Sequence, residues 1–149
     1  MNKDIIQIGE AIHDAMFSFV RAGIGFEDGI QDDLSGGCAI GSYFLTQHVK
    51  KRLGLPIQFK AHSCHAWTEC LEHVYDITYH QFDSSSPKVF VIPSGSDQRY
   101  VDDDYQTLKH IQTCWPEGQQ PRNYRLRWER PNKCHLYLRP GIKLRVSPP

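Results

Sequence analysis

Residues 64–82 read CHAWTECLEHVYDITYHQF, and this stretch decides the fold. Its two halves, residues 64–70 and 74–82, are rich in aromatic and β-branched side chains, which favour β-strands. The residues between them, 71–73, predict a turn, although they lack an Asn-Gly or Asp-Gly pair. We therefore expect an antiparallel hairpin here.

Two helices are predicted before this hairpin. Residues 4–22 carry apolar side chains at three- and four-residue spacing, which is typical of an amphipathic helix. A second helix is expected from about Cys38 to Leu53, where Gly54 stops it. Residues 26–37, which are polar and rich in glycine, predict the loop that joins the helices.

The order of the elements predicts the fold class. Besides the hairpin we expect strands at 57–61 and 88–92, a loop at 93–104, a weak helix at 105–114 and a late hairpin at 124–128 and 135–138. Helices followed by strands, with no repeat or low-complexity linker, predict one α+β domain over residues 1–149, with helices packed on an antiparallel sheet.

Composition excludes several classes of protein. The chain has 149 residues, no apolar run long enough to span a bilayer and no signal-peptide design at its N-terminus. Its five cysteines are an odd number with irregular spacing, which argues against a disulfide framework. We expect a cytoplasmic protein with reduced thiols and no membrane partner.

Charge is unevenly distributed although the formal net charge is zero. Residues 1–40 carry seven acidic and two basic side chains, whereas residues 121–149 carry eight basic side chains and one acidic. The basic segment could meet an acidic protein or nucleic acid. Interleaved Leu and Tyr residues favour an ordered strand pair that faces solvent or the acidic half, so nucleic acid is the less favoured partner.

Cys38 is a candidate nucleophile because it begins the second predicted helix, directly after Ser35-Gly36-Gly37. The first turn of a helix has unpaired N–H groups and a positive dipole end, and both stabilise a thiolate. The glycines allow a substrate to approach the backbone, and the N–H of Cys38 could donate to an oxyanion. The alternative is that Cys38 is a small buried hydrophobe.

His65 and Asp76 lie on the two strands of the expected hairpin and share one face of it. They would be diagonal neighbours, close enough for an imidazole to meet a carboxylate. The carboxylate would fix one ring nitrogen as a donor, and the other nitrogen would accept the proton of Cys38. Taken alone, each side chain is better explained by a structural role at a sheet edge or strand end.

These residues form a pattern: Gly37-Cys38, then residues 65–69 (HAWTE), then residues 75–78 (YDIT) with Gln81-Phe82. The pattern, which covers residues 34–82, resembles the core of the transglutaminase-like superfamily, in a small bacterial or phage-type form. The resemblance implies a papain-like fold in which Cys38, His65 and Asp76 are nucleophile, base and orienting group. The short interval from Cys38 to His65 departs from that pattern, and nothing resembles the calcium sites of the large animal cross-linking enzymes.

Other residues have weaker predicted roles. Gln31 precedes Cys38 and could donate a side-chain N–H to the oxyanion. Trp67 shares the face of His65, so it either walls the site or belongs to the core. Thr78 and Gln81 are expected to support Asp76 and the sheet rather than to touch substrate.

The expected reaction is attack of the Cys38 thiolate on an amide or ester carbonyl of a protein or peptide, with no cofactor. Transfer of the acyl group to water would make the chain a cysteine peptidase or deamidase, which we favour for a small domain. Transfer to an amine would make it an acyltransferase or transglutaminase.

Two other classes of function remain open. His62, Cys64, His65 and Cys70 are zinc-ligand types within nine residues. Neighbours on a strand point to opposite faces, however, and no Cys-x-x-Cys pair is present, so no metal is expected. A non-enzymatic module that binds a peptide, or nucleic acid through residues 121–149, is the second alternative.

Overall fold

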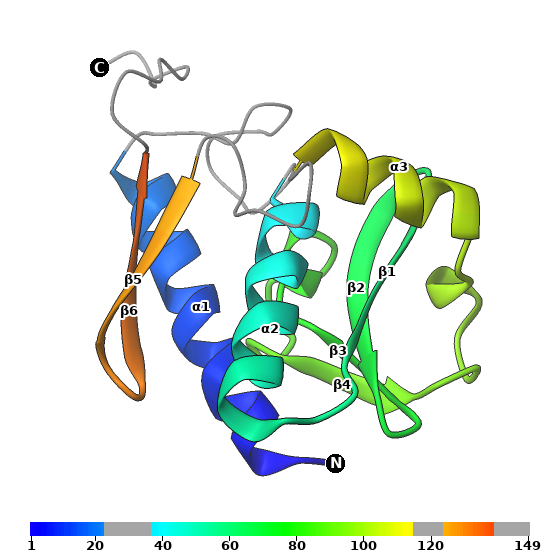
Figure 1. Ribbon diagram of the computed structural model, residues 1–149, viewed down its shortest axis with the longest axis horizontal. Helices are drawn as coiled ribbons and strands as arrows, with labels where there is room; N and C mark the ends of the chain where they lie inside the picture. The colour runs from blue at the N-terminus through cyan, green and yellow to red at the C-terminus, as the bar shows by residue number, and fades with distance from the viewer. Residues whose placement is uncertain (23–36, 115–123, 139–149) are drawn as a thin grey trace.

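A computed structural model describes residues 1–22, 37–114 and 124–138, with the backbone alone at 112–114 (Figure 1). The helices and strands are α1 (Lys3–Arg21), α2 (Cys38–Leu53), β1 (Gln58–His62), β2 (His65–Cys70), β3 (His73–Asp76), β4 (Phe90–Pro93), α3 (Asp104–Cys114), β5 (Tyr124–Arg130) and β6 (Lys133–Leu138). Two short 3₁₀ helices, η1 (Tyr79–Gln81) and η2 (Gln98–Tyr100), complete the order.

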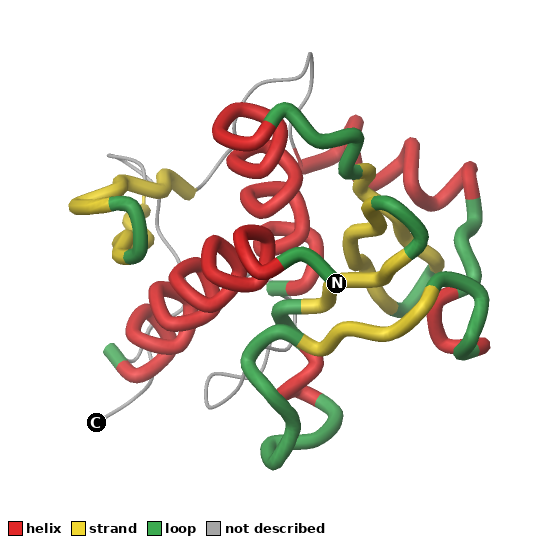
Figure 2. Tube along the Cα trace, turned by 90° about the horizontal axis from the view of Figure 1, so that it is seen from below, coloured by secondary structure: helices red, strands yellow, loops and turns green. Residues whose placement is uncertain are grey.

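The strands form two antiparallel sheets. One has the order β1-β2-β3-β4, and the other is the β5–β6 hairpin. The hairpin, α1, α2 and the four-stranded sheet follow one another across the molecule, and α3 lies along β1 (Figures 1 and 2). The predicted α+β class is therefore confirmed.

Both predicted helices are present at close to their expected bounds. The side chain of Asn2 caps α1 by accepting hydrogen bonds from the backbone N–H groups of Asp4 and Ile5. α2 begins at Cys38 and ends at Leu53, and its C-cap residue Gly54 has a φ of 64°, in the left-handed region that glycine favours. Apolar side chains of both helices form the main core with the sheet.

Two glycines allow the helices to approach the segment after β3. A Cβ atom on Gly9 of α1 would lie 3.0 Å from the side chain of Ile77, and one on Gly41 of α2 would lie 3.1 Å from it. The Gly41 position would also bring Cβ within 2.8 Å of the sulfur of Met16. Ile77 therefore packs directly against the backbones of α1 and α2.

The hairpin predicted within residues 64–82 is present, with a tighter turn and a shorter second strand. Leu71 and Glu72 both have positive φ, 48° and 70°, so they form a two-residue turn of the kind that matches strand twist, without glycine. The strand predicted over 74–82 is wrong beyond Asp76. There the backbone N–H and hydroxyl of Thr78 donate to the Asp76 carboxylate, and this local turn replaces pairing in the sheet.

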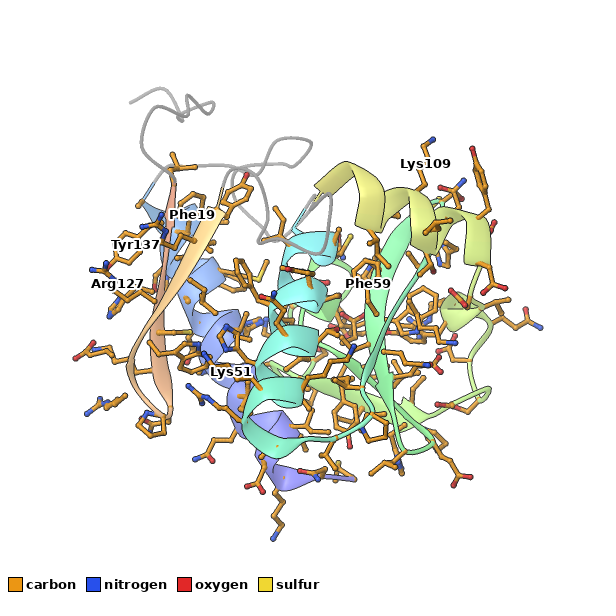
Figure 3. The ribbon with its side chains drawn as sticks, viewed as in Figure 1. Phe19, Lys51, Phe59, Lys109, Arg127 and Tyr137 are labelled. Carbon is orange, nitrogen blue, oxygen red and sulfur yellow. The ribbon has the colours of Figure 1, made fainter. Side chains whose placement is uncertain are left out.

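Among the later elements, α3 lies close to the helix predicted at 105–114, whereas the others were predicted with larger errors in position. The strand expected at 88–92 lies at Phe90–Pro93, and the expected loop at 93–104 contains η2. The late hairpin is present and longer than expected. One face of this hairpin packs on α1, while Arg127 and Tyr137 point outward (Figure 3). Among the described residues there is no helix with the length and apolarity that a membrane crossing requires.

Candidate active site

Cys38 is the first residue of α2, and its side chain is half-buried. Gly37 precedes it as the N-cap residue, and the carbonyl of Gly37 accepts the first hydrogen bond of the helix from Gly41. The thiol therefore lies at the positive end of a helix dipole, beside N–H groups that have no partner within the helix. Such a position favours the thiolate form of a cysteine.

His65 and Asp76 are in direct contact across β2 and β3. The pairing of Thr68 with Tyr75 places Asp76 diagonally from His65, as the sequence predicted. His65 Nε2 donates to Asp76 Oδ2 over 2.7 Å. Only 4% of His65 and 1% of Asp76 is exposed, so the pair is shielded from water.

The Asp76 carboxylate accepts hydrogen bonds from four donors. Oδ1 accepts from the backbone N–H of Thr78 over 2.9 Å and from its hydroxyl over 3.1 Å. Oδ2 accepts from His65, and from the hydroxyl of Tyr100 over 2.8 Å. These four donors replace the hydration that burial removes from the carboxylate.

The pKa of His65 is raised by its partners in spite of its burial. Burial lowers the pKa, but hydrogen bonds to Asp76 and to Cys38 outweigh it and raise the pKa to about 9. These partners favour the protonated form of the imidazole, with Nε2 held by Asp76. The other ring nitrogen, Nδ1, does not bond Asp76 and lies 3.3 Å from Gln81 Nε2.

Aromatic rings enclose the imidazole on several sides. Trp67 stacks on His65, with ring centroids 6.2 Å apart and an interplanar angle of 21°. Trp67 is fully buried, and its indole N–H donates to Glu69. Phe82 meets His65 edge-on at 5.1 Å although 57% of Phe82 is exposed. Trp67 thus supports the imidazole from the interior, and Phe82 covers it on the solvent side.

The other predicted site residues are placed as follows. Gln81 Nε2 lies 3.3 Å from His65 Nδ1 and 3.5 Å from the Thr78 hydroxyl, so Gln81 contacts the base as well as the group that supports Asp76. Gln31, the predicted oxyanion donor, lies outside the described residues.

The cluster of zinc-ligand types around β2 is engaged elsewhere. His62 accepts from the backbone N–H of Cys64 through Nδ1, and its Nε2 lies 2.9 Å from the carbonyl of Arg99. His65 is held by Asp76, and Cys70 is buried in the main core. Within residues 1–22, 37–114 and 124–138, no group of three or more His, Cys, Asp or Glu side chains is placed to hold a metal ion.

Two residues of the site were not identified from the sequence. Tyr100 lies in the stretch predicted as a loop, where no motif marks it, and Phe82 was noted only as part of the family pattern. Their contacts depend on how distant segments pack, and the pattern of one sequence carries no signal for that. Comparison with protein-family models, with curated proteins and with solved structures gave no match to this chain.

Proposed function

We propose that the chain is a cysteine hydrolase with a papain-like, transglutaminase-like core, in which Cys38 is the nucleophile, His65 the base and Asp76 the orienting group. The observation that carries the proposal is the hydrogen bond from His65 Nε2 to Asp76 Oδ2, on an imidazole that also interacts with Cys38 at a helix N-terminus. A nucleophile, a base and a group that orients the base are the three parts that acyl transfer through a thiol requires.

Each part has a defined step in the proposed reaction. The Cys38 thiolate attacks the carbonyl carbon, and the backbone N–H of Cys38 donates to the resulting oxyanion. His65 gives its Nδ1 proton to the leaving amine as the C–N bond breaks, and this leaves a thioester. Neutral His65 then takes a proton from water, whose oxygen attacks the thioester and releases the acid and the Cys38 thiolate. Asp76 keeps the Nε2 proton in place throughout.

The substrate class is a protein or peptide amide, cleaved by peptidase or deamidase chemistry in the cytoplasm. The thioester would react with an amine in place of water if the chain were an acyltransferase or transglutaminase. An acidic partner remains a further prediction for the basic segment at 121–149. The described part of that segment exposes Arg125 and Arg127 on the outer face of β5, beside Tyr137.

The test is the rate at which iodoacetamide alkylates each cysteine between pH 5 and 10, read by peptide mass mapping. Cys64 is exposed and serves as the internal reference. We expect Cys38 to react faster than Cys64 at neutral pH, and to lose that advantage in His65→Ala. The matched control is His73→Ala, because His73 lies in the same sheet and bonds only the nearby carbonyl of Leu71.

Two results would contradict the proposal: equal rates at Cys38 and Cys64 in the native protein, or an unchanged Cys38 rate in His65→Ala. An increase in the mass of the native protein at Cys38 after treatment with p-nitrophenyl acetate would show the acyl-enzyme directly. The same increase should be absent in Cys38→Ser. Chasing that acyl group with water or with a primary amine then distinguishes hydrolysis from transfer.

A further inference from the structure

Tyr100 binds the orienting carboxylate at the same oxygen as the base does. Its hydroxyl donates to Asp76 Oδ2 over 2.8 Å, and His65 Nε2 donates to Oδ2 over 2.7 Å. The two donors of Thr78 use the other oxygen, Oδ1. Tyr100 is thus the one side chain among the described donors that shares an acceptor atom with His65.

The position of this hydroxyl is fixed by packing. Tyr100 is 5% exposed, its ring meets Trp67 edge-on at 5.3 Å, and it lies nearly parallel to Phe90 at 6.4 Å. Its backbone N–H donates to the carbonyl of Asp97 over 3.1 Å, which closes η2. Since ring and backbone are both held, the hydroxyl oxygen cannot move away from Asp76 without disturbing the apolar cluster that Tyr100 forms with Trp67 and Val74.

Sharing an oxygen weakens each of the two hydrogen bonds. A donor on Oδ2 withdraws negative charge from the carboxylate, so that less remains to stabilise the positive charge of the imidazolium. We propose that Tyr100 is a positioning residue which limits how strongly Asp76 holds the proton of His65, and thereby sets the upper pH limit of the Cys38–His65 ion pair. This inference rests on the proposed function, in which that ion pair is the reactive state.

Such a limit has a chemical purpose. His65 must be charged to keep Cys38 as a thiolate, yet it must also release a proton to the leaving amine. A general acid is most effective when its pKa is near the working pH, and a carboxylate that held the imidazolium more tightly would make it a poorer acid. One neutral donor on Oδ2 moderates the charge without removing it.

The other titratable groups nearby do not replace Tyr100 in this role. His65 faces Cys38 from α2, Asp76 from β3 and His62 from β1, whose ring centroid lies 6.4 Å away. Tyr100 interacts with Asp76, Arg99 and Tyr79. The charge of Arg99 is paired with Asp97, and Arg99 also donates to the Tyr79 hydroxyl. Burial and the charge of Asp76 raise the pKa of Tyr100 well above its usual value, so its hydroxyl remains a donor over the pH range in which His65 titrates.

The experiment follows the His65 ring by NMR as pH is varied, with its signal assigned by loss in His65→Asn. In the native protein we expect the midpoint near the pKa of about 9. In Tyr100→Phe we expect it to move up by roughly half to one pH unit, because a hydrogen bond to a charged group is lost. The control Tyr79→Phe removes a phenol hydroxyl from the same aromatic cluster without touching Asp76, and its midpoint should not move.

A second replacement has the opposite expected sign and does not depend on how well the Phe variant folds. Site-specific 3,5-difluorotyrosine at position 100 makes the hydroxyl a stronger donor, so the His65 midpoint should fall. An unchanged midpoint in both forms, or a fall in Tyr100→Phe, overturns the inference. Fast iodoacetamide alkylation of native Cys38 in that case still supports the proposed function. Slow native alkylation together with the expected shifts overturns the proposed function and leaves the link from Tyr100 to His65 intact.

Discussion

Two regions of the molecule each bury a histidine, and the pKa values of the two side chains shift in opposite directions. His65 is 4% exposed and its pKa is raised to about 9, whereas His13 of α1 is 2% exposed and its pKa is lowered. Burial acts in the same direction on both. The difference is that His65 meets the carboxylate of Asp76, while His13 Nδ1 lies 2.8 Å from the backbone carbonyl of Ile77.

The hydrogen-bond partner of His13 is a backbone carbonyl rather than a carboxylate, and the charge of Asp14 only partly offsets its burial. The ring of His80 meets it edge-on at 4.6 Å, and that of Phe17 lies 5.0 Å away. Burial lowers the pKa of His13, the carbonyl of Ile77 raises it only in part, and His80 lowers it further. His13 is thus a neutral structural donor. A carboxylate partner, rather than burial, distinguishes the candidate base from an ordinary core histidine.

The two regions are joined through one short segment. Asp76 directs its side chain toward His65, and the next residue, Ile77, presents its carbonyl to His13 and its side chain to α1 and α2. The structural histidine therefore anchors the backbone on which the orienting carboxylate stands. Substitutions of Asp76 and of His13 should therefore separate the proposed role of His65 at the site from the structural role of His13.

The largest effect is expected for Asp76→Asn, which makes the partner of His65 neutral as that of His13 is. An amide has one acceptor oxygen, so in either orientation its NH₂ group faces donors that now bind the carboxylate. We expect the rate of p-nitrophenyl acetate hydrolysis through Cys38 at pH 7 to fall by about 10²- to 10⁴-fold, the usual contribution of acid–base groups. Asp83→Asn, which removes an exposed turn carboxylate, is the control, and equal rates in the two variants would refute the assignment.

A second effect concerns stability at alkaline pH. The folded pKa of His65, about 9, exceeds the unfolded value near 6.5, so its contribution is fully present below pH 6.5 and is lost as pH rises through 9. As pH rises between these limits, the unfolding free energy of the native protein should fall by up to about 3 kcal/mol relative to that of His65→Gln, as measured by urea unfolding. Parallel stability curves for the two proteins would mean that no such shift exists.

A smaller effect of opposite sign is expected at acid pH. Because the folded pKa of His13 is lowered, its contribution is present above pH 6.5 and is lost as pH falls below that value. In His13→Asn the amide nitrogen can occupy the place of Nδ1 and still donate to Ile77, but it cannot titrate. The acid-induced loss of unfolding free energy should therefore be shallower than in the native protein, which a urea series from pH 7 to 5 would measure. An equally steep loss would assign it to other groups.

The smallest effect is expected for Thr78→Val, which removes one of the two donors to Asp76 Oδ1 and keeps the backbone donor. The lost hydrogen bond should lower the unfolding free energy by about 1 kcal/mol. The His65 titration should move less than in Tyr100→Phe, because Oδ1 does not face the imidazole. A larger shift in Thr78→Val, read by the same NMR titration, would show that the two oxygens are not distinct in their effect.

The sequence predicted those features of the site that depend on local order. The start of α2 at Cys38 follows from the glycines before it, and the diagonal contact of His65 with Asp76 follows from strand parity once the turn is short. The sequence failed where side chains override a local pattern. Residues after Asp76 have strand composition, yet two hydrogen bonds from Thr78 to the carboxylate end the strand.

Contacts between distant segments could not be predicted from the sequence. Tyr100 reaches Asp76 from 24 positions away, and its place is set by the packing of Trp67 and Phe90. The anchoring of Ile77 by His13 spans 64 positions. Neither residue stands in a recognisable motif, because the requirement is for one hydroxyl or one N–H at a point in space rather than for a spacing along the chain.

The proposed nucleophile Cys38 and the proposed base His65 lie on separate elements, α2 and β2, that meet only when the helix docks on the sheet. A newly made or partly unfolded chain would have a thiol and an imidazole, but no ion pair. The alkylation rate of Cys38 therefore also reports whether the contact between α2 and β2 has formed. In pulse-labelling during refolding, the time at which Cys38 becomes reactive would give the time at which α2 docks on the sheet, independently of any substrate.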